Sequence, residues 1–233
     1  KKVITQEEFE ESIERVIAGP ERKSRLISAE EKRIIAYHEA GHAVVMNALP
    51  EADPVQKITI VSRGMAGGYT LSRPAEDRIL MSRKKLIAEM ISLLGGRAAE
   101  ELVFDDITSG ASNDIERVTQ MARTMVTRLG MSDEMGPMVY GQKEELIFLG
   151  REISEQRDYS EAVAQKIDAQ VRALVSEAHQ QAKALLTQYR AELDGVAELL
   201  LEKETITREE FEAVFPTPQP KHSGTPVMLA GNN

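Results

Sequence analysis

The chain has 233 residues, of which 42% are hydrophobic, so it is long enough to bury a sizeable core. Its formal net charge of -9 argues against nucleic acid or an anionic membrane surface as a partner. The absence of cysteine excludes disulfides and thiolate metal sites, and no apolar run approaches the roughly 18 residues of a membrane-spanning helix.

The first predicted element is a helix over about 6 to 18, opened by the capping-box pair Thr5 and Glu8. The sequence enters this helix directly and does not begin with Met, so we expect the chain to be a fragment of a longer protein. A basic stretch over 21 to 25 is predicted to link this helix to the next one.

The second predicted helix, over about 29 to 48, begins after the capping residue Ser28 and carries an H-E-x-x-H motif. Positions i and i+4 share one face of a helix, so His38 and His42 can present their imidazoles to one metal ion. Imidazole suits Zn²⁺, and Glu39 beside the pair is placed to take a proton from a zinc-activated water. The alternative is a helix whose histidines are merely solvated or paired with neighbouring groups.

Two short strands are predicted next, over 57 to 61 and 68 to 71, with a glycine-containing loop over 64 to 67 between them. A helix over about 82 to 103 follows. Its small residues at 95 to 99 predict close packing against another helix, and we expect that helix to be the one with the H-E-x-x-H motif.

A further helix is predicted to end near Leu129 and to be capped by Ser112 or Asn113, with Asp114 in its first turn. An acidic residue in that position commonly does no more than complement the helix dipole. Asp114 is therefore open to two interpretations, a charge at a helix terminus or a metal ligand.

The third ligand is left open by spacing alone, because residue 48, where an extended zinc motif would have histidine, is alanine. His179 and His222 are isolated in the sequence and are predicted to lie at the surface. The candidate ligands are therefore carboxylates: Glu89, Glu100, Glu101, Asp105, Asp106 and Asp114.

The C-terminal half is predicted to be helical, with one long helix over 158 to 190, opened by a capping box of Asp158 and Glu161, and a shorter one over 191 to 202. Thr207 and Glu210 form a capping box for a last short helix. Such helices form a bundle or an oligomer contact, and the residues from 216 onward are predicted to be disordered. The predicted fold is mainly α, with a small β-sheet and a C-terminal helical bundle.

Several motifs occur in order over roughly 28 to 215, which is far more specific than the H-E-x-x-H motif alone. Through them the chain resembles the peptidase domain of the FtsH family of membrane-anchored, ATP-dependent AAA zinc metalloproteases. The motifs are His38-Glu39-Ala40-Gly41-His42, Lys57-Ile58-Thr59-Ile60 before Arg63-Gly64, Gly95-Gly96-Arg97-Ala98-Ala99-Glu100-Glu101, Ser109-Gly110-Ala111-Ser112-Asn113-Asp114-Ile115, Gly136-Pro137, Phe148-Leu149-Gly150 and Glu204-Thr205-Ile206.

The resemblance implies one Zn²⁺ per chain, held by His38, His42 and Asp114, with Glu39 as the general base for hydrolysis of peptide bonds. Glu100 is the alternative third ligand, or otherwise a residue that orients a histidine ring. The domain organisation that it implies is the end of an AAA-module lid and a linker over 1 to 25, a zinc peptidase domain over 26 to 215, and a disordered tail over 216 to 233.

An extended substrate is expected to add to an edge of the small sheet through main-chain hydrogen bonds. The second strand is the favoured edge, which makes Gly68, Tyr69 and Thr70 candidate substrate-binding residues. The alternative is that both strands only cover the core.

The resemblance further implies unfolded or membrane-protein substrates, a homo-hexamer, and an AAA ATPase module in the same polypeptide that uses ATP. The full-length protein would be membrane-anchored, with this domain soluble in the cytoplasm or on the matrix or stromal side of an organelle membrane. Two other functions stay open: a free-standing zinc peptidase, and a non-catalytic helical scaffold with a structural metal.

Overall fold

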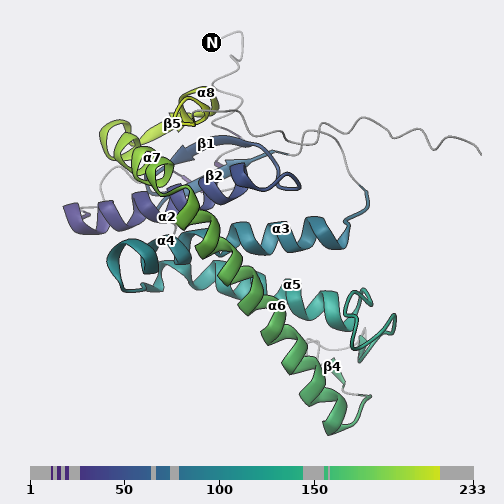
Figure 1. Cartoon of the computed structure of the whole chain (residues 1–233). Helices are drawn as coiled ribbons and strands as arrows, with labels where there is room; N and C mark the ends of the chain where they lie inside the picture. The colour runs from purple at the N-terminus through teal and green to yellow at the C-terminus, as the bar shows by residue number, and fades with distance from the viewer. Residues whose placement is uncertain are drawn as a thin grey trace, which may run out of the picture.

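The computed structural model of the chain describes residues 12, 15, 16, 19, 20, 27–63, 67–73, 79–143, 155, 156 and 158–215 (Figure 1). The helix predicted over 6 to 18 and the loop predicted over 64 to 67 lie mostly outside these residues. The predicted tail over 216 to 233 lies wholly outside them. The division of the chain into lid, peptidase domain and tail therefore stays a prediction.

Helix α2, Ala29–Ala48, runs through the middle of the fold and has the bounds predicted from the sequence. Ser28 caps it, because its side chain accepts a hydrogen bond of 3.1 Å from the backbone N–H of Glu31. The helix ends at Leu49, where the following proline favours an extended backbone. Its middle and C-terminal parts are almost entirely buried, so the helix is a core element and not a surface one.

The prediction of a single helix over 82 to 103 is wrong. This segment forms two helices, α3, Arg83–Leu93, and α4, Gly95–Phe104. The break falls where two consecutive glycines weaken the helix. The predicted close packing is confirmed, since a Cβ at Gly41 would lie 2.5 Å from the carbonyl oxygen of Gly95. Helices α2 and α4 thus meet backbone to backbone, and only glycine permits so close an approach.

A three-stranded antiparallel sheet has the order β2-β1-β5. Strand β1, Val55–Thr59, lies in the middle, so β2, Tyr69–Ser72, is an edge, as predicted. Both strands are offset by one or two residues from their predicted bounds. The third strand, β5, Thr205–Thr207, was not predicted, because three residues are too few to show an alternating pattern. A separate pair joins β3, Gln142–Lys143, and β4, Glu155–Gln156.

The predicted cap of the next helix is wrong. A 3-10 turn, η1, Ser109–Ala111, precedes α5, Ser112–Thr127, and neither Ser112 nor Asn113 caps the helix. The side chain of Thr108 caps the turn instead, by accepting a hydrogen bond of 3.1 Å from the N–H of Gly110. Asp114 lies in the first turn of α5, as predicted.

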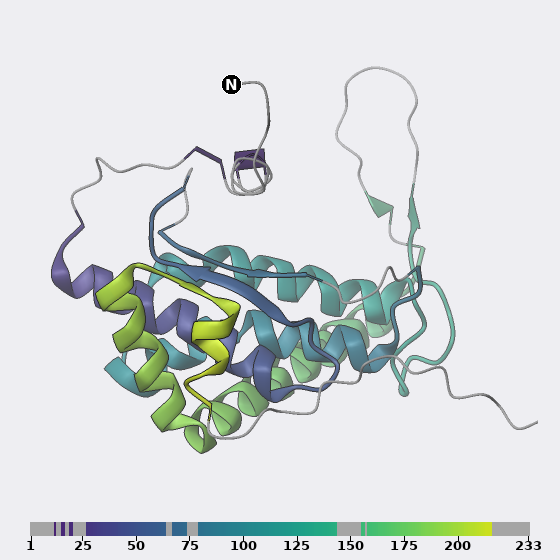
Figure 2. The ribbon, with the colours of Figure 1, turned by 90° about the horizontal axis from the view of Figure 1, so that it is seen from above.

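The C-terminal helices pack on the helices before them. Helix α6, Glu161–Gln188, crosses α3, α4 and α5, and α7, Arg190–Lys203, lies on α2 (Figure 1). Strands β1 and β2 cover another side of α2 (Figure 2). The mainly α fold with a small sheet is therefore the one predicted, and α2 is enclosed on several sides.

Of the two helix caps predicted in the C-terminal half, one is wrong and one is confirmed. Ser160 caps α6, whereas Asp158, the predicted cap, accepts a hydrogen bond of 2.8 Å from the N–H of Gly141. The predicted capping box of Thr207 and Glu210 is confirmed, and it opens α8, Arg208–Glu212. In the described part of the chain, no helix combines the length and the apolar character that crossing a bilayer requires.

Candidate metal centre

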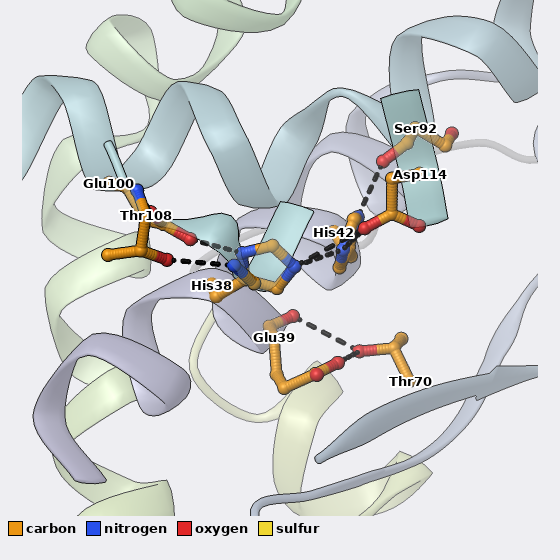
Figure 3. Close-up of polar contacts among 9 residues, drawn as sticks. His38, Glu39, His42, Thr70, Ser92, Glu100, Thr108 and Asp114 are labelled. Carbon is orange, nitrogen blue, oxygen red and sulfur yellow. Dashed lines mark hydrogen bonds and ion pairs between the residues drawn. The ribbon is translucent and has the colours of Figure 1, made fainter. Parts of the chain in front are cut away.

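Three side chains from two helices converge on one point (Figure 3). Within α2, the Nε2 atoms of His38 and His42 lie 3.0 Å apart. From the first turn of α5, the Oδ2 atom of Asp114 lies 3.4 Å from each of these two nitrogens. Among the described residues, these three form the group whose ligand atoms all lie within 4.8 Å of one another.

Both imidazole rings are oriented through their other nitrogen. His42 Nδ1 donates to the carbonyl oxygen of Ser92 at 2.8 Å, since a carbonyl can only accept. His38 Nδ1 lies 2.6 Å from Oε1 of Glu100, an ionised carboxylate that also accepts from the backbone N–H of Thr108 at 2.7 Å. With a proton on each Nδ1, both Nε2 lone pairs face the shared point.

The charges of the cluster call for a cation at that point. Burial alone would raise the pKa of Asp114. The hydrogen bonds to His38 and His42 together have the larger effect and hold the pKa below its ordinary value, so the carboxylate is ionised. Burial lowers the pKa of His38, but Asp114, Glu100 and Glu39 outweigh that effect and raise it to about 10. In the absence of a metal ion, the His38 ring therefore supplies the positive charge with a proton.

The spacing of the three ligand atoms fits zinc. Zinc–ligand bonds of about 2.0 to 2.1 Å in a tetrahedral site hold the ligand atoms about 3.3 Å apart. The distances of 3.0, 3.4 and 3.4 Å among the two nitrogens and the Asp114 oxygen are close to that value. Two neutral imidazoles and one carboxylate are also a donor set that zinc accepts, with a fourth position left over.

Glu39 lies beside this point and turns toward the sheet (Figure 3). It is only 6% exposed, and its Oε2 atom accepts a hydrogen bond of 2.9 Å from the hydroxyl of Thr70. Burial raises the pKa of Glu39, while the two histidines and the Thr70 hydrogen bond oppose that rise. Gly68 makes room for this carboxylate, because a Cβ there would lie 3.1 Å from Oε1 of Glu39.

The other residues predicted as ligands lie outside the group of three. Glu100 contacts His38 at Nδ1, on the far side of the ring, so it orients the ring and does not face the shared point. Glu101 accepts from Lys183 at 2.9 Å and faces His179 at 3.1 Å, and the side chain of His179 is 25% exposed. Glu89, Asp105 and Asp106 are also outside the group, and His222 lies outside the described residues.

Two of the main-chain contacts that orient the histidine rings have no signal in the sequence. Ser92 acts through its main-chain carbonyl, and Thr108 acts on Glu100 through its main-chain N–H, so neither side chain identifies the contact. The close packing of Gly96 was predictable from the sequence, since Gly96 belongs to the run of small residues at 95 to 99. Its contact is with the ring of His38, which a Cβ would approach to 2.5 Å.

A mainly α domain in which an H-E-x-x-H helix and a carboxylate from a second helix converge is the arrangement of a metallopeptidase of the H-E-x-x-H class. Comparison with known families gives a more specific result. The model of peptidase family M41 matches residues 25–214, and the chain belongs to that family.

Curated relatives agree with this membership and with the resemblance predicted from the sequence. The chain is 56% identical over 213 residues to the ATP-dependent zinc metalloprotease FtsH of Thermotoga maritima, a match covering 91% of this chain and 35% of that protein. It is 53% identical over 229 residues to FtsH 1 of Thermomicrobium roseum, covering 97% of this chain and 35% of the relative. The chain therefore spans about a third of the length of these relatives.

Proposed function

We propose that the chain is the zinc-dependent endopeptidase domain of a membrane-anchored AAA protease, and that His38, His42 and Asp114 hold the zinc ion. The observation that carries the proposal is the convergence of their three ligand atoms at 3.0 to 3.4 Å beside the buried carboxylate of Glu39. Membership in peptidase family M41 and the names of the relatives support the same chemistry.

Zinc bound there would polarise the scissile carbonyl and lower the pKa of water at the open position to about 7. Glu39 is the general base: its carboxylate takes a proton from the attacking water and later gives that proton to the leaving amine. Burial raises the pKa of Glu39 above the ordinary value of a glutamate, and a base is most effective when its pKa approaches the working pH. The proton thus stays on one carboxylate between the two steps.

The peptide substrate would lie along the edge of the sheet at Gly68, Tyr69 and Thr70. Strand β2 is an edge of the sheet, and an extended peptide can add to such an edge through main-chain hydrogen bonds. The Thr70 hydroxyl lies 2.9 Å from Glu39, so a peptide on this strand would pass close to the general base. Main-chain recognition of this kind requires an unfolded substrate and carries little sequence preference.

The chain spans about a third of the length of its relatives, and by analogy with them the whole protein would add an ATPase module in the same polypeptide and a membrane anchor. In such a protein the ATPase would use ATP to deliver unfolded or membrane-protein substrates to a homo-hexamer of this domain. The domain would lie in the cytoplasm, or on the matrix or stromal side of an organelle membrane.

A structural metal in a non-catalytic scaffold is less well supported. Structural zinc is normally enclosed by four protein ligands, whereas the group among the described residues has three. Glu39, the acidic residue of the motif, is intact and lies beside the group. A free-standing peptidase would share the same site, and a hexamer in solution would count against it.

The test of this proposal is metal content measured together with cleavage of unfolded casein and of a short unstructured peptide. We expect about one zinc per chain and cleavage that a chelator abolishes and added zinc restores. Zinc at that stoichiometry without cleavage of the short peptide would favour the scaffold. Failure to bind zinc after add-back would overturn the assignment of His38 and His42.

A further inference from the structure

Thr70 links the edge strand of the sheet to Glu39. Its hydroxyl oxygen lies 2.9 Å from Oε2 of Glu39 and 3.2 Å from the main-chain oxygen of the same residue (Figure 3). A hydroxyl has one proton to donate, and the carboxylate is the closer and the charged acceptor. The proton therefore goes to Oε2, and the main-chain oxygen is a second acceptor within reach of the same hydroxyl.

Within the part of the chain that the structure describes, few contacts fix the orientation of the Glu39 carboxylate. Among the described residues, Thr70 is the one whose side chain donates a hydrogen bond to it. On the Oε1 side lies Gly68, whose missing side chain leaves space and offers no donor. Glutamate has three rotatable side-chain bonds, so without an anchor its two oxygens would exchange places and sample several rotamers.

We propose that Thr70 is a positioning residue for the general base: its hydroxyl anchors Oε2 of Glu39 and so keeps Oε1 free to accept the proton of the attacking water. The inference rests on the proposed role of Glu39. The Thr70 proton stays on Thr70 throughout, while the proton taken up by Oε1 passes to the leaving amine. Because Thr70 belongs to β2, the strand proposed to bind substrate also orients the base.

The position of Thr70 allows a sharp pair of substitutions. Thr70→Val keeps the branched shape and the strand preference of threonine but removes the hydroxyl, and Thr70→Ser keeps the hydroxyl but removes the methyl group. Both variants are compared with the unchanged chain for zinc content, thermal unfolding, and kcat and KM on a short peptide.

For Thr70→Val we expect kcat to fall about tenfold to a hundredfold, the size of one hydrogen bond to a charged group, with KM changed less than about twofold. Thr70→Ser should recover most of that loss, to within about threefold of the unchanged chain. Zinc content should be the same in all three proteins. A purely structural role would give the opposite ranking, because serine, and not valine, would disturb the packing of the strand.

Equal kcat for Thr70→Val and the unchanged chain, or a Thr70→Ser variant as slow as Thr70→Val, would overturn the positioning role. Should Thr70→Val unfold, Thr70→Ala supplies the same comparison with Thr70→Ser. A failure of the proposed function gives a different result, since the unchanged chain would then bind no zinc or cleave no peptide.

Discussion

Gly96 lies directly against the imidazole of His38: a Cβ added at Gly96 would come within 2.5 Å of both Cε1 and Nε2 of that ring. The nitrogen concerned is the one that faces the shared point of the cluster. The first turn of α4 therefore packs directly against His38, a candidate zinc ligand. No side chain larger than the hydrogen of glycine fits at position 96.

Gly96→Ala should weaken zinc binding by at least about tenfold, because the ring of His38 must move away from its partners. Gly195→Ala in α7 is the matched control, since its methyl group would meet only a side-chain atom of Val214, at 3.1 Å. Zinc affinity measured by competition with a chromophoric chelator separates the two. Equal affinities would mean that the ring of His38 tolerates displacement.

Asp114→Asn should lower zinc affinity by about a hundredfold or more, because an amide oxygen is a much poorer zinc ligand than a carboxylate. Glu100→Gln should cost less, about tenfold, since Gln can still accept the hydrogen bond that orients His38. Metal titration of both variants checks the order. If the loss were larger for Glu100→Gln, Glu100 and not Asp114 would be the third ligand.

Glu39→Gln should keep zinc and lower kcat on a short peptide by about a hundredfold to ten-thousandfold, the contribution of a general base. Glutamine has nearly the same shape and can still accept from Thr70, so the fold is preserved. Zinc analysis and peptide kinetics on the same sample are the measurement. Cleavage at the normal rate would make the general-base assignment wrong.

Zinc binding at pH 7 should release about one proton per chain, because His38, with a pKa of about 10 in the metal-free protein, must lose its proton to bind. Calorimetry in buffers of different ionisation enthalpy counts the protons. Glu100→Gln should release fewer at pH 8, since that substitution removes a carboxylate that raises the pKa of His38. Zinc uptake at pH 7 with no proton release would contradict the prediction.

The same pKa gives the stability of the metal-free protein a pH dependence. The pKa of His38 in the folded chain lies above its ordinary value of 6.5, so protonated His38 stabilises the fold fully below pH 6.5. That contribution is lost as the pH rises toward 10. Asp114 acts in the opposite range: its pKa is lowered, so its contribution is present above the ordinary value of 3.8 and is lost as the pH falls further. Urea unfolding of the metal-free chain across pH tests both signs.

Ile206→Ala should lower the free energy of unfolding by about 2 to 4 kcal/mol, as expected for a cavity at a fully buried isoleucine. The side chain of Ile206 is 0% exposed, and its partner in the register of the sheet is Ile58. Denaturant unfolding measures the change. A loss below about 0.5 kcal/mol would mean that β5 contributes little to the core.

Elements with strong local signals were predictable, and α2 is the best example. Its cap at Ser28 and its histidine pair depend on residues only a few positions apart. Strand β5 depends instead on a partner far along the chain, β1. No window of sequence contains both members of such a pair.

The candidate site divides in the same way. Spacing alone indicated His38, Glu39 and His42, whereas Asp114 required the resemblance to a known family. The hydroxyl contact of Thr70 with Glu39 joins residues 31 positions apart on a helix and a strand, and threonine in a strand has no local feature that reveals such a partner.

Strand β5 is the last strand of the three-stranded sheet to be synthesised. Strand β2, whose Thr70 donates a hydrogen bond to Glu39, belongs to a sheet whose other edge is Thr205–Thr207, about ninety positions after Asp114. A growing polypeptide cannot form that edge until these residues have left the ribosome. The residues of the candidate metal centre are thus synthesised well before the strand that completes the neighbouring sheet.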